Sequence, residues 1–131
     1  MLKIALTGAE GLVGSRIVEL LKEDFEFINL PQRIMDITNK TQVYQILKDL
    51  NFDIFLHLAA YTNVDGAEKN REIAYKINVE GTKNVFEMVA EKNKKFIYIS
   101  TDFVFDGLAE EPYVETDLPN PQSVYGQTKL D

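Results

Sequence analysis

The length, composition and charge of the chain indicate one globular domain. Its 131 residues are 45% hydrophobic and 27% charged, which excludes a disordered polymer and allows a sizeable apolar core. It has no cysteine, which excludes disulfides and thiolate sites, and its net charge of −7 has the wrong sign for a general nucleic-acid binder.

Apolar spacing predicts alternating strands and helices along the chain. In chain order, the pattern predicts a strand at 2–7, a helix at 12–21, a strand at 25–30, a short strand or loop at 34–37, a helix at 41–50, a strand at 53–58, a long helix at about 67–92 and a strand at 95–100. Asn39 or Thr41 can cap the second helix. The long helix is open to a break near Gly81.

The order of these elements predicts the fold. No hairpin signal joins two strands, which favours parallel βαβ units: a doubly wound, Rossmann-type α/β sheet with helices on both faces. Residues 102–123 hold three of the four prolines and are expected to form a surface excursion. Since Asp131 falls within a predicted helix, we expect a piece of a longer protein.

Three glycines, Gly8, Gly11 and Gly14, lie between the first strand and the first helix. There glycine permits a tight turn, close approach to a pyrophosphate and close packing of helix on strand. Free N–H groups around Val13 would face an anion at the positive end of the helix dipole. The spacing predicts a dinucleotide-phosphate site, and the alternative is an ordinary glycine turn.

The residues after the second strand bear on the coenzyme. A carboxylate there would bind the ribose 2′-hydroxyl of NAD, but the sequence has Arg33 and no acid. A guanidinium suits a 2′-phosphate and favours NADP(H), whereas a solvated Arg33 leaves NAD(H) open. Asp36 suits the adenine edge or a helix cap. Glu10 is an awkward neighbour for a pyrophosphate, and we expect its side chain to point to solvent.

Tyr125 and Lys129 are four residues apart and project from one face of a predicted helix. A tyrosine can donate a proton to a carbonyl as hydride arrives, provided that a nearby ammonium favours the phenolate. Thr101, just after the last strand, supplies a hydroxyl that polarises the same oxygen. Such a pair is also common on surfaces, and its combination with the glycine loop favours a reductase.

Several segments resemble the extended short-chain dehydrogenase/reductase family, and most closely its dTDP-4-dehydrorhamnose reductases. They are TGAEGLVGSRI, HLAAYTNVDGAE, NVEGTKNV, STDFVFDG, PYVETDLPNP and VYGQTKLD. The resemblance implies an NAD(P)-binding Rossmann domain over residues 1–131 of a cytoplasmic, NADP(H)-dependent reductase of a nucleotide-linked 4-keto sugar, in dTDP-L-rhamnose biosynthesis. Family members continue with the last strands and a C-terminal substrate domain, so we expect this part alone to be inactive.

The resemblance also implies roles for individual residues. Thr101, Tyr125 and Lys129 would form the catalytic triad, and Thr101 and Asp102 would reach the substrate sugar. The coenzyme would contact Gly8, Gly11, Leu12, Val13, Gly14, Arg33, Asp36, Ile37, Ala60, Tyr61, Thr62, Tyr125 and Lys129. Asn78 matches an asparagine that many relatives use to brace the active site, or it is an ordinary polar helix residue. No metal is expected.

Other functions stay open. A regulatory, nucleotide-binding subunit resembling the beta subunit of methionine adenosyltransferase is one alternative. A nucleotide-sugar epimerase or dehydratase is another, although Asp102 alone beside Thr101 counts against a dehydratase. The expected partners are a nucleotide sugar and a second copy of the full-length protein, with neither nucleic acid nor membrane. His57 is expected to be a hydrogen-bonded core residue rather than a base.

Overall fold

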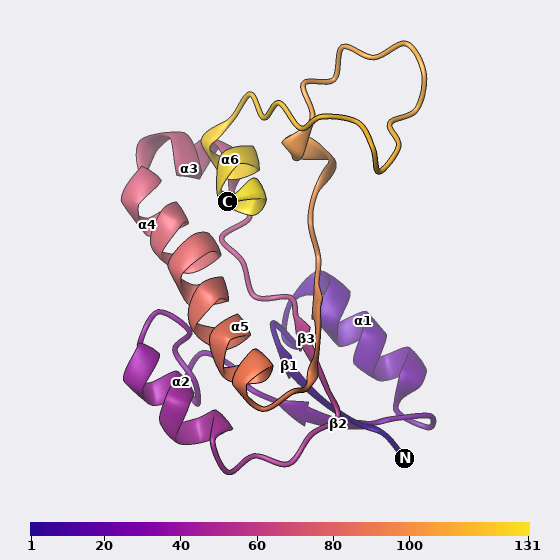
Figure 1. The fold of residues 1–131 in the computed structure, drawn as a ribbon, viewed down its shortest axis with the longest axis vertical. Coiled ribbons are helices and arrows are strands. Elements are labelled where there is room, and N and C mark those ends of the chain that lie inside the picture. The colour runs from indigo at the N-terminus through magenta and orange to yellow at the C-terminus, as the bar shows by residue number, and fades with distance from the viewer.

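The four strands form one parallel sheet. The computed structural model describes residues 1–131, with strands β1 (Lys3–Thr7), β2 (Glu26–Asn29), β3 (Ile54–His57) and β4 (Lys95–Tyr98). Their order is β2-β1-β3-β4, and every neighbouring pair is parallel. Because β1 lies between β2 and β3, the chain winds first to one side of β1 and then to the other (Figure 1). The predicted Rossmann-type α/β fold is confirmed.

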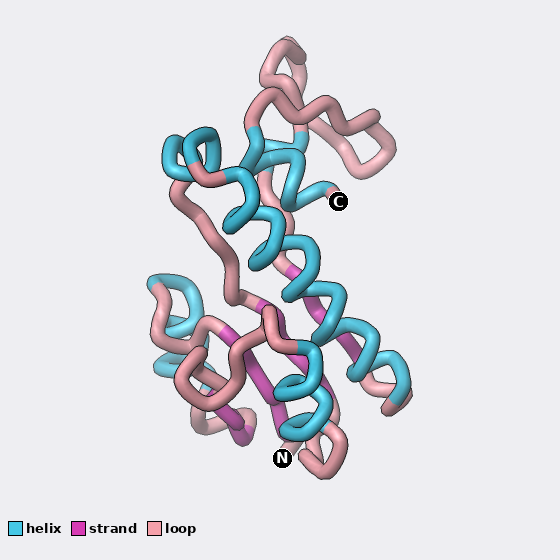
Figure 2. The backbone as a smooth tube through the Cα atoms, turned by 90° about the vertical axis from the view of Figure 1, so that its left-hand side faces the viewer, coloured by secondary structure: helices cyan, strands magenta, loops and turns pink.

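Helices connect the strands and cover both faces of the sheet. They are α1 (Leu12–Leu21), α2 (Lys40–Leu47), α3 (Val64–Lys69), α4 (Arg71–Tyr75), the π-helix η1 (Lys76–Gly81), α5 (Thr82–Glu91), the 3-10 helix η2 (Asp102–Val104) and α6 (Val124–Leu130). Helix α1 packs on one face, and α2 with α5 packs on the other. Figure 2 shows the segment from α3 to α5 running along the length of the molecule. No helix has the length and hydrophobicity that crossing a membrane requires.

Strand alternation divides the apolar residues into two layers. Successive strand side chains point to opposite faces, so one strand serves both layers. Ala5 and Phe55 join the larger cluster, on the side of α2 and α5. Ile4, Leu6 and Leu56 join the smaller cluster, on the side of α1. The apolar runs of the sequence are therefore strands buried on both faces.

The helices differ in detail from their prediction. Of the strand or loop predicted at residues 34–37, the structure has the loop. Of the two predicted caps of α2, Asn39 is the one observed, and its side chain accepts a hydrogen bond from the Gln42 amide at 3.1 Å. The predicted long helix begins at Val64 and is interrupted at Asn70, whose side-chain amide donates to the Gly66 carbonyl at 3.3 Å. Asn70 has a φ of −128° and a ψ of 56°, outside the helical region, so one helix ends there and the next begins at Arg71. The chain stays helical through Gly81, so the break expected near that glycine is absent.

The predicted excursion projects from the end of the molecule opposite the N-terminus (Figure 1). Its internal contacts centre on Asp106, whose carboxylate accepts hydrogen bonds from the Leu108 amide, the Tyr113 hydroxyl and the Asn120 side chain. The backbone hydrogen bond, followed by the two side-chain bonds, holds the pKa of Asp106 below its usual value. These contacts order a segment that has no regular secondary structure beyond η2.

Candidate functional site

The glycine loop connects β1 to α1 through two close backbone approaches. Gly8 has a φ of +74°, and a Cβ there would lie 2.8 Å from the backbone nitrogen of Ala59, just beyond β3. At Gly14, a Cβ would lie 2.2 Å from the Gly8 carbonyl oxygen. Glycine at these two positions therefore allows the left-handed turn and the close packing of helix on strand.

The first turn of α1 presents amides without protein partners. Gly11 is the N-cap residue and provides no side-chain hydrogen bond. Neither the backbone nor any side chain accepts a hydrogen bond from the amides of Leu12, Val13 and Gly14. Together with the positive end of the helix dipole, these three donors form a site suited to a phosphate or pyrophosphate.

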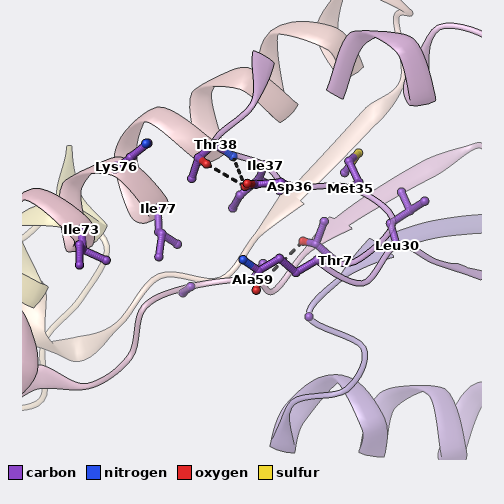
Figure 3. Close-up of a pocket in the computed structure, with 13 residues that line it drawn as sticks. Thr7, Leu30, Met35, Asp36, Ile37, Thr38, Ala59, Ile73, Lys76 and Ile77 are labelled. Atoms are coloured by element: carbon purple, nitrogen blue, oxygen red, sulfur yellow. Dashed lines mark hydrogen bonds between the residues drawn. The ribbon is translucent and has the colours of Figure 1, made fainter. Parts of the chain in front are cut away.

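A cavity of about 360 Å³ opens at the carboxyl ends of the first three strands, where Gly8 of the glycine loop lines it. Figure 3 shows Ile73 and Ile77 on one side of it and Leu30 and Met35 on the other. The residues that line it are Thr7, Gly8, Leu30, Gln32, Met35, Asp36, Ile37, Thr38, Ala59, Ala60, Ile73, Lys76 and Ile77. Its mostly apolar walls and its place at the strand ends suit a flat heterocycle such as adenine.

The loop after β2 forms one wall of the cavity through Asp36. The Asp36 carboxylate accepts hydrogen bonds from the Thr38 amide at 2.9 Å and the Thr38 hydroxyl at 2.7 Å. The Asp36 amide donates to the Gln42 side chain at 2.8 Å, and the Asn84 side chain donates to the Ile37 carbonyl at 2.9 Å. Asp36 therefore shapes the loop and lines the cavity, while Asn39 provides the helix cap.

The cavity includes residues that the sequence interpretation missed. Gly8, Asp36, Ile37 and Ala60 were predicted to bind the coenzyme and do line the cavity. The missed residues are Thr7, Leu30, Gln32, Met35, Thr38, Ala59, Ile73, Lys76 and Ile77. The spacing i, i+3, i+4 of the last three was a usable signal, because it places them on one helix face.

Arg33 and Glu10 lie beside the cavity rather than in its lining. The Arg33 guanidinium donates to the Glu10 carboxylate, and the pair joins the loop after β2 to the loop after β1. Both side chains are exposed, at 69% and 66%. Glu10 is exposed to solvent as expected, but its ion pair with Arg33 was not predicted.

Asn78, on the π-helix η1, connects the loop after β3 to α6. Its side-chain oxygen accepts from the Tyr61 amide at 2.7 Å, and its side-chain nitrogen donates to the Tyr61 carbonyl at 3.1 Å and to the Thr128 hydroxyl at 2.9 Å. The Thr128 hydroxyl in turn donates to the Tyr125 carbonyl at 2.8 Å. This buried network joins two segments that carry predicted site residues, since Tyr61 lies between Ala60 and Thr62.

The start of α6 is fixed from three directions. Ser123 caps the helix by accepting from the Gly126 amide at 3.0 Å, and Glu68 of α3 accepts from the first amide of the helix at 2.8 Å. A Cβ at Gly126 would lie 2.3 Å from the Phe103 carbonyl oxygen, so α6 packs directly on η2. The Phe103 and Tyr125 rings then meet edge to face, 5.9 Å apart.

Thr101 and Asp102 lie where β4 leads into η2. The Thr101 hydroxyl oxygen accepts from the Phe103 amide at 3.2 Å and donates to the Asp102 carboxylate at 3.3 Å. Because Phe103 packs on Tyr125, the structure brings the Thr101 segment against the helix that carries the tyrosine. No cluster of histidine and acidic residues here could hold a metal ion.

Lys129 is buried beside Tyr98, a residue that the sequence interpretation did not identify. Its ammonium nitrogen lies 4.2 Å from the centre of the Tyr98 ring, and only 8% of the residue is exposed. Burial lowers the pKa of Lys129 to about 8. Burial and the neighbouring Tyr125 raise the pKa of Tyr98 to about 12, so the ring under the ammonium stays neutral.

Sequence and structure comparisons identify the family. The family model described as RmlD substrate binding domain matches residues 2–131. The chain belongs to this family. Its sequence is 36% identical over 133 residues to the dTDP-4-dehydrorhamnose reductase of Aggregatibacter actinomycetemcomitans, covering 100% of this chain and 45% of that protein.

Two further similar proteins bear on function. A crystal structure of dTDP-4-dehydrorhamnose reductase from Bacillus anthracis in complex with NADP matches with a TM-score of 0.94 and 39% identity, covering 99% of this chain and 47% of that one. The methionine adenosyltransferase 2 subunit beta of Bos taurus is 31% identical over 144 residues, covering 98% of this chain and 41% of the bovine protein. The chain thus spans less than half the length of these relatives.

Proposed function

We propose that this chain is the coenzyme-binding part of an NADP(H)-dependent reductase that acts on a nucleotide-linked 4-keto sugar. The observation that carries the proposal is the set of free amides at the start of α1, together with an apolar cavity of suitable size that Gly8 of the same glycine loop lines. The similarity to a dTDP-4-dehydrorhamnose reductase in complex with NADP supports this choice of coenzyme, and NAD(H) is the alternative. The corresponding pathway is dTDP-L-rhamnose biosynthesis in the cytoplasm.

The chain's own residues supply the proton chemistry. When bound, the reduced nicotinamide supplies the hydride. Tyr125 then gives its phenolic proton to the oxygen of the keto group, and the hydroxyl of Thr101 donates a hydrogen bond to that same oxygen. Lys129 would bind the nicotinamide ribose, and its cation would favour the resulting phenolate. Thr101 and Asp102 bind the sugar.

The remaining assignments concern the whole protein. We propose that residues 1–131 bind the dinucleotide as one domain, through Gly8, Gly11, Leu12, Val13, Gly14, Arg33, Asp36, Ile37, Ala60, Tyr61 and Thr62 in addition to Tyr125 and Lys129. The sugar needs residues from the rest of the relatives' length, so this part alone has little activity. The partners are a nucleotide sugar and a second copy of the protein, with neither nucleic acid nor membrane.

The test mixes the whole protein with NADPH and dTDP-4-dehydrorhamnose and follows the nicotinamide absorption band. Tyr125→Phe should lower kcat by roughly 10²- to 10⁴-fold, because it removes the proton donor. Its dissociation constant for NADPH, measured by calorimetry, should change less than about two-fold, since the ring and its packing remain. Tyr44→Phe, on the exposed side of α2, is the matched control. A Tyr125→Phe enzyme with the parent rate would contradict the proton-donor role.

A regulatory subunit that binds the nucleotide without turnover is the second candidate, which the similarity to the bovine beta subunit favours. The same assay separates the two. Tight binding of NADPH together with no consumption of coenzyme would support the regulatory function. The presence of both Tyr125 and Lys129 on α6 favours the enzyme, because a protein that only binds the nucleotide needs no proton donor.

A further inference from the structure

The ion pair between Glu10 and Arg33 lies at the edge of the nucleotide cavity. Glu10 is in the turn between β1 and α1, two residues after Gly8, and Arg33 directly follows Gln32. Gly8 and Gln32 both line the cavity. The pair therefore joins two loops that border the same cavity, and both charged groups are accessible to a ligand that enters it.

We infer that Glu10 determines coenzyme selectivity by competing with the ribose 2′-phosphate for Arg33. This inference rests on the proposed function, and it adds a residue to the choice between NADP(H) and NAD(H). A guanidinium binds carboxylates and phosphates with the same N–H donors, and Glu10 occupies one of the terminal nitrogens of Arg33, so the two anions compete for the same cation. With Glu10 in place, the 2′-phosphate meets a paired cation and an additional negative charge.

NAD(H) encounters neither obstacle. Its ribose carries a neutral 2′-hydroxyl at that position, so the ion pair can stay closed when it binds. Glu10 consequently lowers the affinity for the phosphorylated coenzyme more than the affinity for the unphosphorylated one. The protein should then accept both, with less preference for NADP(H) than an unpaired Arg33 would give.

Two nucleotides that differ only in this phosphate test the inference: adenosine 2′,5′-bisphosphate and adenosine 5′-monophosphate. Calorimetry on the whole protein gives the ratio of their affinities. Glu10→Gln should raise the ratio in favour of the bisphosphate by about three- to ten-fold at low ionic strength, and salt should reduce the gain. Arg33→Gln should lower the ratio. When Arg33→Gln is already present, adding Glu10→Gln should change the logarithm of the affinity ratio by less than half as much as it does in the parent protein.

The matched control is Glu19→Gln in the Arg16–Glu19 pair on α1. That pair has an N–O distance of 2.7 Å and exposed fractions of 61% and 64%, close to those of the Arg33–Glu10 pair, and neither residue lines the nucleotide cavity. Glu19→Gln removes the same charge from an exposed arginine–glutamate pair away from the cavity, so it should leave the ratio unchanged.

Each outcome has a distinct meaning. If both nucleotides bind and Glu10→Gln leaves the ratio unchanged, the inference is wrong while the proposed coenzyme site stands. If Lys76→Gln lowers the ratio and Arg33→Gln does not, the phosphate binds the lysine of the cavity and the inference is overturned. If the parent protein binds neither nucleotide, the proposed function fails and the inference fails with it.

Discussion

His57, the single histidine of the chain, gives a quantitative prediction of how the stability of the protein depends on pH. It lies at the end of β3 with 1% of its surface exposed. Its Nδ1 hydrogen-bonds the Thr7 hydroxyl at 2.8 Å, and its Nε2 lies 3.1 Å from the Thr82 hydroxyl. Burial, and then the charge of Lys129, lower the pKa of His57 from 6.5 to about 4. It is thus the hydrogen-bonded core residue that its place in an apolar strand predicted.

This pKa shift makes stability depend on pH below neutrality. Between pH 6.5 and about 4 the unfolded chain binds a proton at His57 that the folded chain does not. The stabilisation is fully present above pH 6.5 and is lost as the pH falls towards 4. A shift of this size corresponds to about 3 kcal/mol in the free energy of unfolding. About 2 kcal/mol of it should be lost by about pH 5, where ordinary carboxylates are still mostly ionised.

Two measurements test this prediction. The imidazole signal of the one histidine, followed by NMR against pH, should not titrate above about pH 5. Urea unfolding at about pH 7 and pH 5 should show the loss of stability in the parent protein but not in His57→Gln, which cannot titrate in this range. Each protein is compared with itself at the two pH values, so the effect of the substitution on stability at a fixed pH cancels. An NMR midpoint near 6.5, or an equal loss in the variant, would refute the reasoning.

Three further substitutions have expected outcomes that unfolding and turnover can check. Gly14→Ala should lower the free energy of unfolding by about 2–4 kcal/mol and weaken nucleotide binding, because its Cβ would lie 2.2 Å from the Gly8 carbonyl oxygen. An unchanged free energy of unfolding would contradict the close packing. Asn78→Ala should cost about 2–4 kcal/mol, since it leaves buried partners without hydrogen bonds. Lys129→Met should raise the free energy of unfolding by about 1–3 kcal/mol at pH 7, because it removes a buried ammonium over Tyr98. The same variant should have no turnover. A destabilised variant would show that the lysine has a structural role.

The features that local sequence fixes were predictable. Apolar runs gave the four strands to within two residues at each end, and the spacing of Gly8 and Gly14 indicated the turn that the structure contains. Helix α1 has the bounds that its apolar spacing predicts. In each case the signal and the structure depend on residues close together in the chain, so composition and periodicity suffice.

Contacts between distant segments were not predictable in the same way. Tyr98 and Lys129 are 31 residues apart, and only the packing of α6 beside β4 brings them together. The Glu10–Arg33 pair joins two loops 23 residues apart, and neither loop alone indicates the other's charge. The π-helix also went unrecognised, because a single wider turn inside a continuous helix has no sequence pattern of its own.

The position of Asn78 connects these observations to function. A π-turn gives less favourable hydrogen bonds than an α-turn, and such turns are frequent at functional sites. Here the turn carries a buried asparagine that holds both the loop after β3 and the Thr128 hydroxyl of α6. A protein that only bound the adenosine end of a nucleotide would need the cavity, but it would not need α6 fixed to the same network. The network therefore fixes the helix that carries Tyr125 relative to the loop after β3, which is the positioning that the proposed proton transfer requires.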